Sequence, residues 1–133
     1  GCLHPGQRGR GTLLVQFPSL RFNRQEEVLL RSGVFLVRNG RASWYSTIQS
    51  EEQPYVRFDP GCMFPVTADG HEAGRILQQR IAASRPTRID WTHGKVVILD
   101  NWRLLHGRES AEGDEDRVLL RVLVLDETGR GEA

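Results

Sequence analysis

The chain has 133 residues, with 18 basic and 17 acidic side chains and a formal net charge of +1. This length allows one hydrophobic core, and the balanced charge gives no overall field that would attract nucleic acid or an anionic membrane. No apolar run approaches the roughly 18 residues that a membrane-spanning helix requires. Only two cysteines are present, Cys2 and Cys62, so there is no disulfide framework. We therefore expect one soluble, cytoplasmic domain without nucleic-acid or membrane partners.

The N-terminal half of the chain is predicted to form a loop, several short strands and one short helix. Gly and Arg dominate residues 1–11, which favours a loop. After a break at residues 18–24, residues 25–31 are predicted to form one or two helical turns. An Asn-Gly pair at residues 39–40 predicts a hairpin turn. The predicted strands of this half are residues 12–17, 34–40, 42–49 and 55–58.

The C-terminal half is predicted to begin with a longer helix over residues 69–83. Its apolar residues fall on one face at helical spacing, and Pro86 follows as a stop signal. Many short strands with few helices are typical of a β-sandwich or a jelly roll with helical decoration. The predicted strands of this half are residues 88–92, 96–100, 104–107 and 117–125.

The last predicted strand carries two arginines on one face. Because side chains alternate along a strand, Arg117 and Arg121 point the same way as Leu119, and the intervening apolar residues point into packing. A buried unpaired charge costs on the order of several kcal/mol, so these arginines need anionic partners. A bound dicarboxylate is one possibility. Protein carboxylates are the other, with candidates Glu109, Glu112, Asp114 and Asp116.

A spacing pattern around His106 resembles the C-terminal motif of the taurine dioxygenase-like, or clavaminate synthase-like, family of iron(II)/2-oxoglutarate-dependent dioxygenases. In that motif a strand ends in Asp-Asn, a His follows within a few residues, and an Arg comes eleven residues after the His. The resemblance implies a mainly β double-stranded β-helix (jelly roll) with helical decoration, incomplete in this chain. The matching residues are Asp100-Asn101, His106-Gly107-Arg108, Arg117 and, four residues further, Arg121.

The resemblance also implies roles for individual residues. His106 would be the distal histidine of a two-His-one-carboxylate iron site; a single His at a strand end can instead be a hydrogen-bonded structural residue. Arg117 would hold the far carboxylate of 2-oxoglutarate, and Arg121 its C1 carboxylate or an acidic group of the substrate. Residues 9–12 resemble the family's Gly-Gly-x-Thr strand, which implies that Thr12 touches 2-oxoglutarate.

A weaker part of the resemblance concerns the substrate. Residues 55–60 are similar to a segment in which relatives place substrate contacts, so Arg57 and Asp59 are candidates, with turn-flanking surface charges as the alternative. Trp91 and Trp102 are candidates for lining a pocket or for core packing.

The family's first two iron ligands, a His-x-Asp or His-x-Glu motif, are not found at any histidine of this sequence. We therefore expect residues 1–133 to be a single domain that forms the C-terminal part of the jelly roll, with the missing ligands upstream and the chain inactive alone. The implied activity uses Fe(II), 2-oxoglutarate and O2 to hydroxylate an organic acid, an amino acid or a natural-product intermediate, releasing succinate and CO2. The parent protein could form a homo-oligomer. The alternatives are a non-catalytic carboxylate-binding domain of the same fold and a β-sandwich interaction module with structural arginines.

Overall fold

A computed structural model describes residues 1–52, 55–109 and 115–124. The fold is mainly β with two α-helices, which confirms the predicted class. The helices are α1 (Arg24–Ser32) and α2 (Ala68–Ala83), with one 3-10 turn, η1 (Phe17–Ser19). The strands are β1 (Cys2–His4), β2 (Thr12–Gln16), β3 (Phe35–Asn39), β4 (Ala42–Ser46), β5 (Met63–Pro65), β6 (Thr87–Ile89), β7 (Leu104–Arg108) and β8 (Val118–Leu119).

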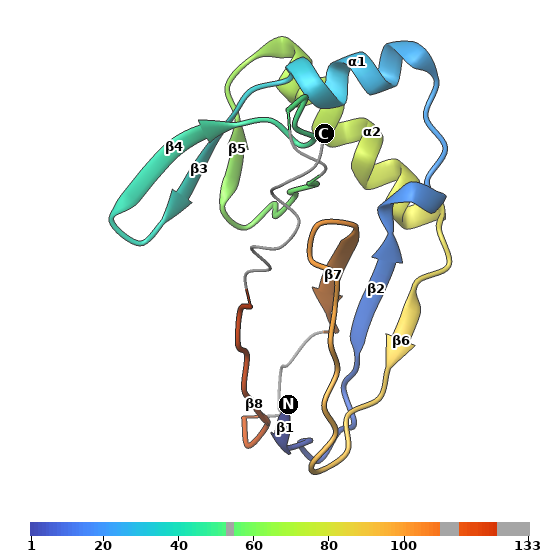
Figure 1. The fold of residues 1–133 in the computed structure, drawn as a ribbon, viewed down its shortest axis with the longest axis vertical. Coiled ribbons are helices and arrows are strands. Elements are labelled where there is room, and N and C mark those ends of the chain that lie inside the picture. The colour runs from blue at the N-terminus through green and yellow to red at the C-terminus, as the bar shows by residue number, and fades with distance from the viewer. Residues whose placement is uncertain (53–54, 110–114, 125–133) are drawn as a thin grey trace, which may run out of the picture.

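The described strands form three small antiparallel sheets, in the orders β4-β3-β5, β6-β2-β7 and β1-β8. The helices and the β4-β3-β5 sheet lie at one end of the molecule, and β1 with β8 at the other (Figure 1). The β6-β2-β7 sheet runs between these two ends. The jelly roll itself stays a prediction, because the described strands do not join into one closed arrangement.

Local signals fix where both helices begin. Asn23 caps α1 by accepting from the Glu26 N–H, while the Glu26 carboxylate accepts from the Asn23 N–H, both at 2.9 Å. The Thr67 hydroxyl caps α2 by accepting from the Gly70 N–H at 3.0 Å, and it also accepts from the Val34 N–H at 3.1 Å. One hydroxyl therefore joins the start of α2 to the segment before β3. No helix of the described residues is long and apolar enough to cross a membrane.

The start of α2 approaches the backbone before β3 so closely that only glycine fits. A Cβ on Gly70 would lie 2.5 Å from the Val34 carbonyl oxygen, and one on Gly33 would lie 2.8 Å from the Asp69 carbonyl oxygen. Further along the helices, Arg80 Nη2 donates to Glu26 Oε1 at 2.7 Å. The two helices are thus held together at both a backbone contact and a side-chain pair.

The main hydrophobic core lies between the two helices and the β4-β3-β5 sheet. Leu105 of β7 also packs against this core, so the strand that carries His106 is anchored to it. The buried members are Phe17, Leu30, Phe35, Val37, Ile48, Met63, Ala73 and Leu77.

Two predicted strands are wrong in the described structure. Residues 96–100 form no strand, and Ile98 is 95% exposed. The predicted strand 117–125 is reduced to β8, and beyond it Val122 and Val124 are 82% and 87% exposed rather than packed. The physical reason is the same for both segments: a strand is fixed by a hydrogen-bonded neighbour, and no described strand pairs with residues 96–100 or with residues 120–124.

Three smaller differences concern the N-terminal half. The predicted loop 1–11 contains β1, which pairs with β8. In the β3–β4 hairpin, Asn39 pairs with Ala42, so the turn residues are Gly40 and Arg41 rather than Asn-Gly; Gly40 has the positive φ of +60° that the first position requires. The predicted strand 55–58 is only a single bridge between Gln49 and Val56.

Candidate functional site

The β6-β2-β7 sheet brings Thr12 and His106 to the same face. Thr12 lies opposite Arg108 and Leu14 lies opposite His106, and residues two apart on a strand share a face. Thr12 is buried, with 8% of its surface exposed, and its hydroxyl oxygen accepts from Trp91 Nε1 at 2.9 Å. Since a hydroxyl that accepts one bond can still donate its own proton, Thr12 can hydrogen-bond an anion.

Glu109 joins the ends of the three strands of this sheet, just beyond β7. Its carboxylate accepts from the Gly11 N–H at 2.6 Å and from Arg88 Nε and Nη2 at 3.1 and 3.2 Å. The Arg88 bonds, and then the Gly11 bond, hold the pKa of Glu109 below its ordinary value. Arg88 also donates to the Gly9 carbonyl and pairs with Asp90. Both oxygens of Glu109 are therefore occupied, and this carboxylate does not serve Arg117.

Arg117 comes immediately before β8, and part of its guanidinium is buried without a partner. The Nε and Nη2 atoms are buried and make no hydrogen bond within the described part of the chain. Among the carboxylates predicted as its partners, Glu109 is bound to Arg88. Asp116 is near another residue, because its Oδ2 lies 3.7 Å from His4 Nδ1. Glu112 and Asp114 lie outside the described residues.

The unpaired atoms of Arg117 form the side of a guanidinium that fits a carboxylate. Two other arginines of this chain use the same two atoms in this way. Arg75 donates from Nε and Nη2 to the two oxygens of Glu72, and Arg88 donates from Nε and Nη2 to those of Glu109. Such bidentate pairs are strong and geometrically specific. The Nε–Nη2 edge of Arg117, unpaired among the described residues, has the donor arrangement that binds a carboxylate.

Arg121 is in a different situation. It is exposed and lies beyond β8, in a stretch without strand structure. The predicted alternation that would place it beside Arg117 therefore does not extend this far. Its role toward 2-oxoglutarate or substrate stays a prediction.

His106, the candidate iron ligand, lies on an exposed part of β7. No group of three or more His, Cys, Asp or Glu side chains that could hold a metal ion occurs in residues 1–52, 55–109 and 115–124. A two-His-one-carboxylate site requires three protein ligands. The described residues do not fit an iron ion by themselves, and His106 stays a predicted ligand.

Arg57 and Asp59 both have local partners. Asp59 Oδ1 accepts from the Gly61 N–H at 2.9 Å, as in a turn, and the Arg57 guanidinium lies 5.5 Å from the Trp44 ring centre and 5.7 Å from that of Tyr55. These contacts are what the alternative of turn-flanking charges describes. The contacts of both residues are explained without a substrate, so a substrate role for either one stays a prediction.

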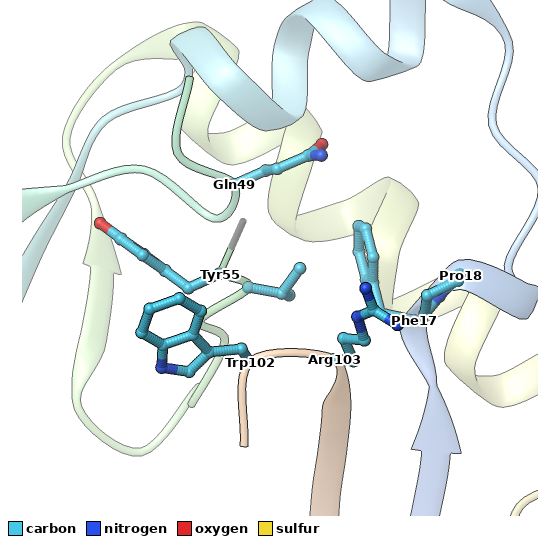
Figure 2. Close-up of a pocket in the computed structure, with 7 residues that line it drawn as sticks. Phe17, Pro18, Gln49, Tyr55, Trp102 and Arg103 are labelled. Atoms are coloured by element: carbon cyan, nitrogen blue, oxygen red, sulfur yellow. The ribbon is translucent and has the colours of Figure 1, made fainter. Parts of the chain in front are cut away.

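A pocket of about 370 Å³ lies beside this segment, at the end of β7 opposite to Thr12. Figure 2 shows Tyr55 and Trp102 on one side and Phe17, Pro18 and Arg103 on the other. The backbone holds the walls together, since the Phe17 N–H donates to the Arg103 carbonyl at 2.9 Å and the Val56 N–H to the Trp102 carbonyl at 3.1 Å. Trp102 therefore lines a pocket, while Trp91 supports Thr12.

Sequence reasoning missed the bond between Glu109 and Arg88 and a second arginine with an unpaired buried atom, Arg10. The one feature of the sequence that points to this region is the Gly-rich stretch around Gly11, which indicates a close approach of the backbone. A Cβ at Gly11 would lie 2.9 Å from Arg88 and from the Ile89 carbonyl oxygen, so glycine is needed for the strands to approach.

Comparison with known proteins gives one match. Residues 80–123, about a third of the chain, match the model of a family described as "Taurine catabolism dioxygenase TauD, TfdA family". The matched segment contains His106, Arg117 and Arg121, whereas Thr12, Arg57 and Asp59 lie outside it. It supports a relation to taurine dioxygenase-like proteins and a dioxygenase type of function. No curated protein and no solved structure matches the chain significantly.

Proposed function

We propose that this chain carries the 2-oxoglutarate-binding part of the active site of an iron(II)/2-oxoglutarate-dependent oxygenase. The observation that supports this most directly is the buried Nε–Nη2 edge of Arg117, which has no partner among the described residues. Because these two nitrogens are buried, a hydrogen bond from them to an anion is electrostatically stronger than one from an exposed arginine. The position of Arg117 within the matched family segment is independent support.

In this proposal Arg117 binds the far carboxylate of 2-oxoglutarate through two parallel hydrogen bonds. The Thr12 hydroxyl, held in place by Trp91, donates a third hydrogen bond to the cosubstrate. Enzymes of this class oxidise a small molecule with O2 while 2-oxoglutarate is converted to succinate and CO2. The contribution of these residues is to bind and orient the cosubstrate.

His106 is proposed as one ligand of the iron ion. Two further ligands are required, and they are not among the described residues. We also propose that the β6-β2-β7 and β1-β8 sheets belong to a jelly roll and that the substrate is an organic acid, an amino acid or a natural-product intermediate. These finer points rest on the resemblance to the family.

The test is calorimetric titration of the chain with 2-oxoglutarate. Arg117→Gln should weaken binding by about tenfold or more, because a bidentate charge-assisted pair is lost. Arg117→Lys should bind better than Arg117→Gln but less tightly than the unmodified chain, since an ammonium keeps the charge without the two-pronged geometry. Arg41→Gln, in the exposed β3–β4 turn, is the matched control for the loss of one charge. Equal affinity of Arg117→Gln and the unmodified chain would overturn the proposal.

A second candidate function is a carboxylate-binding domain without catalysis. It is favoured by one observation: the described residues offer an anion site but no set of three metal ligands. Succinate release that requires Fe(II) and is stimulated by a candidate substrate would favour the oxygenase. Binding of 2-oxoglutarate with no such release, in a form of the protein that includes every proposed ligand, would favour the binding domain.

A further inference from the structure

We propose that residues 96–100 and 120–124 are the two sides of a slot that accepts one more β-strand. The occupant is an extended apolar segment, joined to β1 through Gly1 and antiparallel to both sides. This inference is independent of the proposed function, because it uses only backbone bonds, register and exposed apolar side chains. It assigns one partner to two segments that have no described strand beside them.

The first step is that the start of the chain already lies between the two sides. The Gly1 ammonium donates to the Leu120 carbonyl at 2.7 Å, and the Leu120 N–H donates to the Gly1 carbonyl at 2.8 Å, as in an antiparallel pair. On the other side, the Cys2 carbonyl accepts from the Gly94 N–H and the Cys2 N–H donates to the Lys95 carbonyl, both at 2.9 Å. Gly94 has a φ of +77°, which makes this an antiparallel pair with a glycine bulge.

The second step is that both sides continue past Gly1 with unpaired backbones. A Cβ on Gly1 would lie 3.5 Å from Val96 Cγ2, so Val96 is the residue beside Gly1 on that side. Beyond it, residues 96–99 and 121–124 make no backbone hydrogen bond within the described part of the chain. Figure 1 shows both segments leading from the β1-β8 end toward the helices. Unpaired donors and acceptors of this kind are a template for another strand.

The third step is the register, which fixes the place of each inserted residue. Counted away from Gly1, the first inserted residue lies between Val97 and Arg121, and the second lies between Ile98 and Val122. Because side chains alternate, the second and fourth inserted residues share the face of Gly1. On this face both sides of the slot carry apolar residues that are more than half exposed, namely Val96, Ile98, Leu120, Val122 and Val124. The occupant therefore needs apolar side chains at its second and fourth positions.

A strand joined to Gly1 is favoured over a second copy of the chain because it uses both sides of the slot. An edge strand of a second copy would pair with one side and leave the other unpaired. A strand in line with β1 bonds alternately to the two sides, to Val97 and Leu99 on one and to Val122 and Val124 on the other. Joining it to the chain also makes the pairing intramolecular, which raises its effective concentration.

The experiment extends the 133-residue chain by four residues, Val-Thr-Val-Thr, ahead of Gly1, which places valine at the second and fourth positions of the slot. Amide hydrogen exchange is measured by NMR for each residue of the extended and the unmodified chain. The extension should slow exchange about tenfold or more at Val97, Leu99 and Val122, whose N–H groups face the inserted strand. Ile98 and Leu123, whose N–H groups face away, should stay within about twofold. Exchange in α2 verifies that each form is folded.

Two controls separate strand insertion from a general effect of added residues. The extension Val-Pro-Val-Pro has the same length and the same valines, but proline does not fit a strand that is paired on both sides, so exchange should stay as in the unmodified chain. In the Val-Thr-Val-Thr form, Ile98→Thr should reduce the protection, because the apolar neighbour of the second inserted residue is lost. Val28→Thr, at an exposed apolar position of α1, should not reduce it.

Three outcomes overturn the inference. The first is unchanged exchange in the Val-Thr-Val-Thr form. The second is equal slowing of the two sets of amides, or equal slowing by the two extensions, because neither depends on a paired strand. The third is slow exchange at Val97 and Val122 in the unmodified chain that increases with its concentration, because the occupant is then a second copy.

Discussion

Glu109 connects two strands of the β6-β2-β7 sheet through its carboxylate. It connects Gly11, before β2, with Arg88 of β6, and it follows β7 directly. Its carboxylate accepts these bonds most strongly when it is ionised, which is why the bonds lower its pKa. The position of the Gly-rich segment before Thr12 therefore depends on the protonation state of one residue.

The pH dependence of stability follows from the lowered pKa of Glu109. The pKa is below its ordinary value of 4.5 in the folded chain, so the stabilisation is present above that value and is lost as the pH falls through the folded pKa. We expect Glu109→Gln to lower the urea midpoint near neutral pH and to reduce its further fall in acid. Urea titrations from about pH 7 to about pH 3 measure this. Glu51→Gln, which changes an exposed loop glutamate, is the control. If the urea midpoint of Glu109→Gln falls between about pH 7 and about pH 3 as much as that of the unmodified chain, Glu109 does not cause the acid sensitivity.

The residues of the candidate site differ in how far the sequence predicted them. His106 and Arg117 could be proposed as site residues because a motif with fixed spacing contains both. The bond between the Gly11 N–H and Glu109 joins residues 98 positions apart, and whether Arg10 Nε finds a partner among the described residues depends on where the neighbouring side chains lie. Both properties depend on residues that are far apart in the sequence, so neither could be predicted from a local pattern without the fold.

Among the elements, α2 approaches the segment before β3 so closely that a Cβ built on Gly70 would lie 2.5 Å from the Val34 carbonyl oxygen, the shortest such distance of the described glycines. A side chain at Gly70 would collide with the Val34 carbonyl oxygen, which is backbone and has little room to move. We expect Gly70→Ala to lower the free energy of unfolding by about 1–3 kcal/mol, the usual cost of overpacking. Urea unfolding measures this, with Gly107→Ala as the control because nothing lies within 4 Å of a Cβ there. An unchanged midpoint in Gly70→Ala would show that the contact relaxes easily.

The elements that the sequence predicted are those whose signals are local. The predicted helices at 25–31 and 69–83 lie within two residues of α1 and α2, since the signals of a helix lie within or next to its own segment. The hairpin at 34–49 was found for the same reason. Residues 96–100 and 120–124 carry an apolar pattern as well, but a strand also needs a neighbour, and pairing between distant segments is not visible in the pattern.

At the scale of the whole molecule, these two segments carry several strongly exposed apolar side chains. Ile98 is 95% exposed, and Val96, Val122, Leu123 and Val124 are all more than two-thirds exposed. Apolar, extended segments without a strand neighbour favour association with other chains. We therefore expect the chain to self-associate as its concentration rises.

Lysine substitutions test this expectation. Ile98→Lys combined with Val122→Lys should shift the chain toward the monomer, because charges oppose edge pairing and apolar contact. Light scattering coupled to size-exclusion chromatography at several concentrations measures the mass. Val28→Lys, at a position of α1 that is 55% exposed, is the control for a single added charge on an apolar site. The same mass distribution in the double variant and the unmodified chain would exclude these segments as the contact.

The short β1-β8 ladder has a consequence for how the anion site works. It pairs Cys2 with Leu119 and His4 with Val118, and it therefore fixes the backbone next to Arg117 with very few bonds. So small a ladder between distant parts of the chain opens at a low free-energy cost. If an anion binds Arg117 only when the ladder is formed, the two events are linked equilibria: occupancy of the site closes the ladder, and closure of the ladder raises affinity by the same factor.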